Sequence, residues 1–455
     1  MKKVISSFLA MSLMACLLAG CSGGETPQTS SADPGTSSSS SEVSDPGTSG
    51  EPVYISEDAE SLSGEVRFYT AFDGAAGTDA LIAEFNEYYP NITVTPTTYK
   101  NSADGNVGLD TAMMAGEVDV LLSFGVANTA QRWTNNLLMD LTDRLAADNL
   151  DLKTEWGTDV YTYNDRVYVF PSGGLSVYVA INMDKWEAAG LGELPTEWTY
   201  DEYLEACRAM TEKTADGSIA VYGGSDFNQT DYWTYSIRQS KGTNAFYNED
   251  GTSDFDNPLW ETVLQREVDA EKEGIWYSKA NYLADSTKSR DILTRYITAS
   301  DSTFKIGYAP YPVNEEGETN YMGGAIPNSF VGVASNTQNP DAAYAFAKFC
   351  ATYGNKYMYA AGHATTWTGV DPEEIVEVVF GSREDAEKRI DVDSFISSVV
   401  ATGEPAYSED YIVAFAEIQS LIEEYSKYVF NGEMTVDDAL NEMKELADQA
   451  IADAS

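Results

Sequence analysis

Residues that could contact a small ligand follow two of the strands that the sequence predicts. The strand in EVRFYTAFDG ends in residues 69–73, and the strand in VDVLLSFG ends in residues 123–125. Ligands of open α/β sheets bind beyond the carboxyl ends of the strands. The tyrosine, phenylalanine, serine and aspartate found there are suited to hydrogen bonds and ring contacts with a solute.

Motifs for catalysis are missing from the full sequence. It has no P-loop, no G-x-S-x-G, no H-E-x-x-H and no C-x-x-C, and its single histidine, His363, cannot build a common zinc site. A glycosidase needs two carboxylates beside the scissile bond, but with 73 acidic residues such pairs are easy to nominate and decide little. We therefore expect a binding protein without catalysis, metal or cofactor, and we interpret His363 as a surface-loop residue.

The elements that position these strand ends alternate between strand and helix. The apolar stripe of Leu81, Ile82 and Phe85 predicts a helix that Thr78 caps and Pro90 stops. NITVTPTTY predicts a second strand, residues 108–115 a second helix, and VDVLLSFG a buried parallel strand. This alternation predicts the α/β fold class.

The stretch PSGGLSVYVAINMDKW, residues 171–186, predicts a strand that crosses between the two halves of a binding cleft. The residues of VYVAIN alternate with the period of a strand, and NMDKWEAAG predicts a short helix after it. Residues 171–174 predict irregular backbone before the strand. We expect Tyr178 on the cleft side.

Helix boundaries further along the chain are marked by capping residues. Thr199 and Glu202 have the spacing of a capping box. Asn339 as N-cap, Pro340 as first helical residue and Gly354 as terminator delimit another helix.

Two cysteines, Cys207 and Cys350, lie in the region expected to fold. Each falls on the apolar face of a predicted helix. We therefore expect two buried free thiols.

The charge is strongly acidic. Lys and Arg number 27 against 73 Asp and Glu, for a net charge of −46. Binding to nucleic acid or to an anionic membrane surface needs clustered cations, so both partners are disfavoured. The acidity indicates either a solubilising surface or a preference for cationic solutes.

The N-terminal region predicts export and anchoring. Residues 1–20 have the basic start and apolar run of a secretory signal peptide, and LAGC at its end resembles a bacterial lipobox whose Cys21 is lipidated. Residues 21–63, rich in Ser, Thr, Gly and Pro, predict a disordered tether after that cysteine. A diacylated cysteine gives stable anchoring. We expect the chain on the extracellular face of a cell membrane, of the Gram-positive type, attached through lipid alone.

Three segments in order resemble the extracellular solute-binding proteins that serve ABC importers, in the sugar-binding family that includes maltose-binding protein. They are GGLSVYVAINMDKWEAAGLGELPTEWTYDEYLEA, NSFVGVASNTQNPDAAYAFAKF and NGEMTVDDALNEM. The resemblance implies a periplasmic-binding-protein-like α/β fold of two discontinuous lobes that close around a solute. Residues 64–172 plus 325–370 would form lobe one, and residues 173–324 plus 371–455 lobe two. It also implies a monomer that delivers a carbohydrate, expected to be an oligosaccharide, to an ABC transporter permease.

The resemblance also implies where the solute lies, because a sugar site needs hydrogen-bonding side chains and aromatic planes. A tryptophan of the family's second lobe is absent here, where only Tyr296 and Tyr311 are available. The expected ligand-binding residues are Tyr69, Phe72, Asp73, Ser123, Phe124, Tyr178, Tyr232, Trp233, Tyr311, Gly323 and Trp367.

Other classes stay open at this point. A peptide or polyamine receptor of the same fold would suit the acidic balance, although only Asp73 stands out as a carboxylate at the expected cleft. A tethered extracellular glycosidase is a different class, and so is an adhesin, which would not need strands crossing a hinge.

Overall fold

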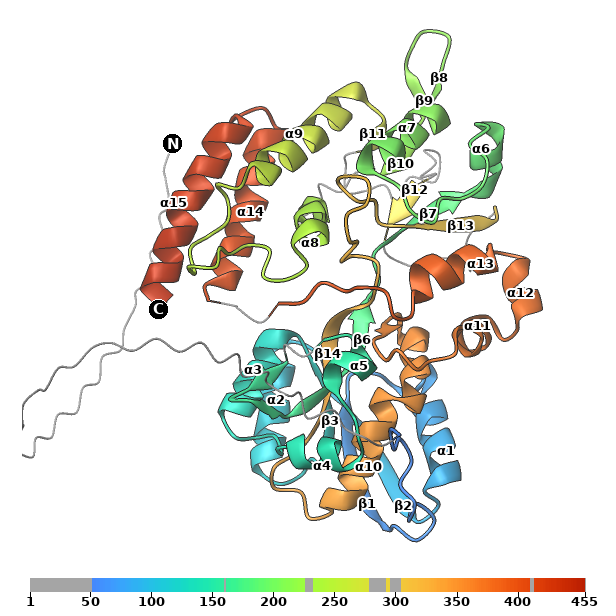
Figure 1. The fold of residues 1–455 in the computed structure, drawn as a ribbon, viewed down its shortest axis with the longest axis vertical. Helices are drawn as coiled ribbons and strands as arrows, with labels where there is room; N and C mark the ends of the chain where they lie inside the picture. Colours follow the sequence, from blue (N-terminus) through green and yellow to red (C-terminus); the bar gives the residue numbers. More distant parts are fainter. Residues whose placement is uncertain are drawn as a thin grey trace, which may run out of the picture. The chain divides into compact units, whose positions relative to one another are not determined.

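The structure, a computed structural model, describes residues 51–158, 161–225, 232–277, 292–294, 304–409 and 413–454 (Figure 1). The predicted signal peptide, Cys21 and Tyr296 lie outside these residues. Within them, no helix is long and apolar enough to cross a membrane.

A six-stranded mixed sheet organises the first part of the fold. Its strands are β1 (Gly64–Thr70), β2 (Ile92–Thr98), β3 (Val120–Phe124), β6 (Val169–Leu175), β14 (Ile326–Val333) and β15 (Ala364–Thr365). In the described residues their order is β15-β6-β14-β3-β1-β2. β1 pairs in parallel with β2 and β3, as the alternation of strand and helix predicts, and β14 pairs antiparallel with β3 and β6. We call this sheet and its covering helices the first lobe.

The helices of the first lobe cover both faces of that sheet. They are α1 (Thr78–Tyr88), α2 (Ala103–Met114), α3 (Val126–Thr134), α4 (Thr142–Ala147), α5 (Leu152–Trp156) and α10 (Pro340–Ala351), with 3-10 helices η1 (Gly74–Ala76) and η3 (Tyr353–Ala361). As predicted, α1 buries Leu81 and Phe85, and the Phe85 ring meets Phe346 of α10 edge-on at 5.0 Å. The prediction of Thr78 as N-cap is wrong, because Gly77 holds that position at φ 99°, a left-handed conformation that glycine adopts without strain.

Residues 51–62, which we call the strap, pack on the first lobe. Ala59 is buried in the core, and Tyr54, Ile55 and Leu62 pack against it. The prediction of a tether reaching residue 63 is therefore wrong at its C-terminal end. The sequence of the strap contains the aromatic and aliphatic residues that residues 22–50 lack almost entirely.

The predicted start of α10 is confirmed, but its predicted end is wrong. Asn339 is the N-cap and Pro340 the first residue, whereas the helix ends at Ala351 and Gly354 lies inside η3. A Cβ added at Gly354 would lie 3.0 Å from the Phe349 carbonyl oxygen, so glycine here permits a close backbone approach.

The predicted crossing is made by two paired strands. β6 ends at Leu175, and three residues later the chain enters β7 (Tyr178–Asn182) of a second sheet. β14 brings the chain back, paired with β6 from Ile326–Leu175 to Gly332–Val169. The prediction of irregular backbone at residues 171–174 is wrong, since they lie in β6, although the pairing shifts register around Ser329.

The second sheet consists of β7, β12 (Ile292–Thr294) and β13 (Ile306–Pro310). β7 is central and antiparallel to both neighbours, so both of its edges are hydrogen-bonded. Val179 and Ile181 pack into the second lobe's core, while Tyr178 lies on the opposite face with its ring 5.6 Å from Tyr308. Tyr178, expected on the cleft side, is instead buried at 2% exposure.

The second lobe is the second sheet together with helices from two stretches of the chain. They are α6 (Met183–Ala188), α7 (Tyr200–Met210), η2 (Tyr232–Thr234), α8 (Tyr235–Lys241), α9 (Pro258–Glu273), α14 (Phe415–Phe430) and α15 (Val436–Ala454). The predicted capping box of α7 is confirmed: Thr199 Oγ1 accepts from the Glu202 N–H, and Glu202 Oε2 accepts from the Thr199 N–H at 2.7 Å. Cys207 and Cys350 are buried and free, as predicted.

Short helices between α10 and α14 contribute to a core cluster that contains residues of both sheets. They are α11 (Pro372–Phe380), α12 (Arg383–Glu387), α13 (Val392–Phe395) and the π-helix η4 (Ile396–Val400). Ile375 and Phe395 belong to the core cluster that also holds Phe85 of the first lobe and Tyr308 of the second sheet. The predicted division of the lobes at residue 370 stays a prediction.

Small two-stranded ladders complete the fold: β4 (Thr162–Tyr163) with β5 (Arg166–Val167), β8 (Glu212–Lys213) with β9 (Ile219–Val221), and β10 (Gly224–Ser225) with β11 (Trp276–Tyr277).

Candidate functional site

Three aromatic rings converge beyond the carboxyl ends of β1 and β3. Phe72 follows β1, Phe124 ends β3, and His363 immediately precedes β15. Their ring centroids lie 5.4 Å (Phe72 to Phe124), 5.2 Å (Phe72 to His363) and 5.7 Å (Phe124 to His363) apart. We call these three residues the ring cluster. It lies at the sheet edge where the sequence places Phe72 and Phe124.

An open hollow of about 630 Å³ lies against the ring cluster. Hydroxyl, amide and ammonium groups from the end of β2 form its polar side, so rings and hydrogen-bonding groups face the same space. Among the described residues that line it there is no carboxylate, and the charged one is Lys100. The lining residues are Ala71, Phe72, Thr98, Tyr99, Lys100, Asn101, Phe124 and His363.

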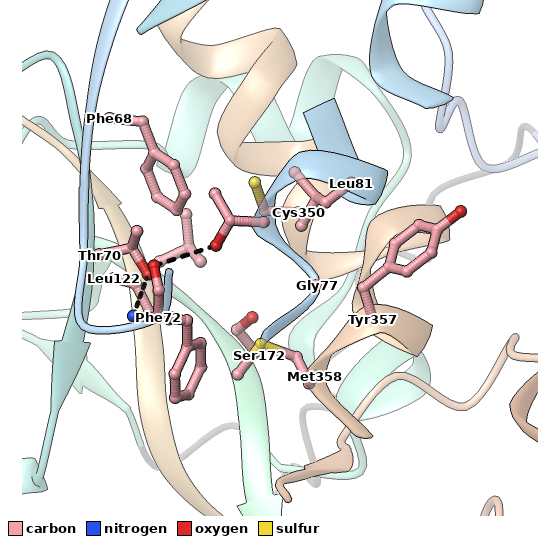
Figure 2. A pocket seen from close by; sticks show the side chains of 12 residues that line it. Phe68, Thr70, Phe72, Gly77, Leu81, Leu122, Ser172, Cys350, Tyr357 and Met358 are labelled. Carbon is pink, nitrogen blue, oxygen red and sulfur yellow. Dashed lines mark hydrogen bonds between the residues drawn. The ribbon is translucent and has the colours of Figure 1, made fainter. Parts of the chain in front are cut away.

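The backbone of Phe72 is fixed by two threonines (Figure 2). Thr70 Oγ1 accepts a hydrogen bond from the Phe72 N–H at 3.1 Å, and Thr78 Oγ1 donates to the Phe72 carbonyl at 3.1 Å. Phe72 also lines a small cavity of about 20 Å³ in the lobe, together with Ser172 and Met358. The ring thus forms a partition between the lobe's interior and the outer hollow.

A buried polar network surrounds Ser123, the residue directly before Phe124. Ser123 is 1% exposed, and its Oγ lies 2.7 Å from Thr129 Oγ1 and accepts from Arg132 Nη1. Arg132 also donates to Asp110 at 2.7 Å and to Asn106 at 2.7 Å. A buried guanidinium needs such partners to offset its lost hydration. Ser123, expected as a ligand contact, is therefore committed to this internal network.

Tyr99, which lines the hollow, is held by its hydroxyl. That group donates to the Leu122 carbonyl at 2.8 Å, and burial raises the pKa of Tyr99 to about 12. The phenol is neutral at physiological pH. It presents its ring, rather than a charge, to the hollow.

His363 is the residue that sequence reasoning missed. It lies in a loop directly before β15, as interpreted, but its ring is half-buried in the ring cluster. Burial lowers the pKa of His363 below its ordinary value, which favours the neutral imidazole. Its position follows from β15 pairing with β6, a contact between distant segments that no local pattern indicates.

Other predicted first-lobe residues lie apart from the hollow's lining. Tyr69 is half-buried against the core on the other side of β1, and Asp73 is exposed beside Phe72. Trp367 is 5% exposed, and its indole N–H donates to Glu155 at 3.2 Å. Trp367 therefore faces the core instead of covering a cleft.

The predicted second-lobe residues are mostly core residues in the described part of the chain. Trp233 is fully buried, donates to Ser426 Oγ at 3.0 Å and packs on Trp260. Tyr311 is fully buried with its hydroxyl 2.9 Å from Ser236 Oγ. The side chain of Tyr232 lies outside the described residues. Gly323 packs near Glu404, where an added Cβ would lie 3.6 Å from that residue's own Cβ.

A cluster of charged and aromatic residues lies next to Tyr311, whose ring is 6.4 Å from the Tyr200 ring. Glu267 is 1% exposed and accepts from the Tyr200 hydroxyl at 2.5 Å, while its other oxygen has no hydrogen-bond partner among the described residues. Burial raises the pKa of Glu267 to about 7, although the neighbouring Arg266 acts against this. The Arg266 guanidinium lies 3.4 Å above the Tyr200 ring and donates to Ser236 at 2.8 Å.

The fold is that of periplasmic binding proteins. Residues 72–357 match the family described as bacterial extracellular solute-binding protein, and because the match covers more than half of the chain, the protein belongs to this family. The fold class predicted from the sequence is confirmed.

Solved structures share the fold at low sequence identity. A sugar transporter protein from Rhizobium etli in an open conformation has a TM-score of 0.68 and 18% identity, covering 85% of this chain and 99% of its own. An ABC substrate-binding protein from Listeria monocytogenes in complex with cycloalternan has a TM-score of 0.60 and 17% identity, covering 86% and 99%. The sugar-binding protein MalE from Xanthomonas citri has a TM-score of 0.66 and 15% identity, covering 86% and 98%. A comparison with curated protein sequences gave no match.

Proposed function

We propose that this protein is an extracellular receptor that captures a carbohydrate, an oligosaccharide rather than a single sugar, at the hollow beside the ring cluster. The observation that carries the proposal is the meeting of the three rings with Thr98, Lys100 and Asn101 around one open space. Sugars combine apolar ring faces with many hydroxyls, so they are matched by aromatic planes beside donors and acceptors. The hollow offers both.

The size and chemistry of the hollow support a solute larger than an ion or an amino acid. Its volume of about 630 Å³ falls in the usual range for small-molecule sites. A polyamine would call for carboxylates, and none line the hollow among the described residues. Two proteins of similar fold are named for sugar transport or sugar binding, and a third is in complex with cycloalternan. These names support the same solute class.

Delivery to an ABC import permease and attachment through Cys21 complete the proposal. The family is extracellular and solute-binding, which supports the role of a receptor. The LAGC motif at the end of an apolar leader supports a lipid anchor. Hinged closure of the two lobes would enclose the solute without chemical change.

Calorimetry across a panel of solutes tests the proposal. The panel contains neutral oligosaccharides, amino sugars, peptides and polyamines, and we expect saturable binding to one oligosaccharide class. Phe72→Ala should then weaken that binding by about tenfold, since an aromatic contact contributes roughly 0.5–1.5 kcal/mol beyond its buried area.

Tyr163→Ala is the matched control, because Tyr163 is an exposed aromatic residue of the same lobe that does not line the hollow. It should bind the solute as tightly as the unchanged protein. Binding of polyamines or peptides alone would refute the carbohydrate assignment. Turnover of a glycoside by the purified chain would refute the role of a receptor without catalysis.

A further inference from the structure

The strap is fastened to the first lobe by a buried lysine. Lys348 of α10 has no exposed side-chain surface, and its ammonium donates to Asp148 at 2.6 Å and to the Val53 carbonyl at 2.7 Å. The Val53 N–H in turn donates to the Asp148 carbonyl at 2.8 Å. Because a buried ammonium needs all its partners, the strap carbonyl is part of what allows Lys348 to lie inside the lobe.

One residue further on, Tyr54 enters an aromatic group. Its ring meets Trp367 edge-on at 5.2 Å and Tyr353 edge-on at 5.8 Å. Its hydroxyl donates to Glu155 Oε2 at 2.7 Å, the same oxygen that accepts from the Trp367 indole. Tyr54 and Trp367 are thus held together both by their rings and by a shared, buried carboxylate.

Tyr353 and Trp367 bound the segment that carries His363. Between them lie η3 and the two-residue strand β15, whose ladder with β6 is limited to Gly173 and Gly174 in the described residues. So short a ladder contributes little stability on its own. Within the segment, Met358 and Tyr359 are buried in the first lobe's core, and Tyr54 contacts the residues at both of its ends.

We propose that Tyr54 is a positioning residue of the hollow, which holds the segment of residues 353–367 through Trp367 and Tyr353 and thereby keeps the His363 ring against Phe72 and Phe124. The strap lies before the first strand of the fold and does not line the hollow. Its effect on the hollow is indirect. The inference does not depend on which solute the hollow takes.

The single histidine makes the test direct, because the full-length chain gives one set of imidazole resonances in NMR spectra of histidine-labelled protein. In Tyr54→Ala we expect those resonances to shift toward the position of an exposed histidine, since the ring leaves Phe72 and Phe124. The imidazole pKa should rise toward its ordinary value. Tyr54→Phe keeps the ring contacts and should restore most of the original shift.

Asn91→Ala is the matched control. It removes the hydrogen bond from Asn91 to the Glu60 carbonyl near the other end of the strap and leaves the contacts of Tyr54 in place. It should lower the melting temperature without moving the His363 resonances. If Tyr54→Ala does not fold, Tyr54→Leu, which keeps apolar bulk but loses the ring and hydroxyl, takes its place. Unchanged His363 shifts and titration in a folded Tyr54 variant would overturn the proposal and leave the strap a stabilising element alone.

Discussion

Two sets of aromatic residues, one from each lobe, differ in the surface that they leave open. In the first lobe, Phe72 and His363 are half-buried and border an open hollow. In the second lobe, Trp233 and Tyr311 are fully buried, and their polar atoms are bonded to Ser426 and Ser236. The first set has surface left for a solute, whereas the second set has its contacts with the protein itself.

The difference shows that the role of an aromatic residue is decided by its position relative to the sheet, and not by its residue type. Residues beyond the carboxyl ends of parallel strands lie where the sheet stops and the covering helices begin, so their rings keep one open side. Trp233 of η2 and Tyr311, directly after β13, lie in the second lobe's core, where packing covers every side.

The largest effect expected from this comparison is on the stability of the second lobe. Trp233→Ala should lower the free energy of unfolding by roughly 3–5 kcal/mol, the range for removing a buried large aromatic side chain. Urea unfolding followed by circular dichroism measures it. Phe72→Ala should cost clearly less, because its ring is only half-buried. Equal costs at the two positions would break the comparison.

A second, smaller effect depends on pH and arises from Glu267. Its folded pKa of about 7 lies above the ordinary 4.5, so the folded chain holds an extra proton between these values and stability falls as pH rises through them. Glu267→Gln should leave stability unchanged near pH 4.5 and raise it by up to about 3 kcal/mol above pH 7. Denaturant titrations at both pH values measure the difference.

Glu261→Gln, an exposed position on the same helix, is the control and should show no such pH dependence. If Glu267→Gln were destabilising at high pH, the carboxylate would be a favourable charged partner of Arg266, and the second lobe's core would be held by an ion pair instead of by packing.

The smallest effect expected concerns His363 and has the opposite sign. Its folded pKa lies below the ordinary value of 6.5, so the unfolded chain binds the extra proton and stability is lost as pH falls below 6.5. His363→Phe should remove this loss while keeping a ring in the cluster. The comparison of melting temperatures at pH 5.5 and 7.5 checks it, and an unchanged loss would assign the acid sensitivity to other groups.

Local signals in the sequence predicted much of the fold correctly. The strands β1, β2 and β3, the capping box at Thr199 and the start of α10 at Pro340 depend on nearby residues, and each is confirmed. The same logic placed Phe72 and Phe124 at strand ends, because the carboxyl ends of parallel strands share one edge. That rule needs no knowledge of distant contacts.

The predictions that failed depend on contacts between distant segments. His363 lies directly before β15, which pairs with the distant strand β6, and Trp367 is buried against Glu155 and the strap. Tyr178 has the alternation of a strand, but the alternation does not tell whether one or both faces are covered. In each case the deciding contact is remote in sequence.

The pairing of β6 with β14 has a mechanical consequence. The strand β6, from which the chain leaves the first sheet, and the strand β14, by which it returns, are hydrogen-bonded to each other over almost their whole length. Sliding one strand along the other would break their ladder of hydrogen bonds, whereas flexing across the flat face keeps it intact. In the proposed hinged closure, this ladder would favour a bend across its face over a slide of one strand along the other.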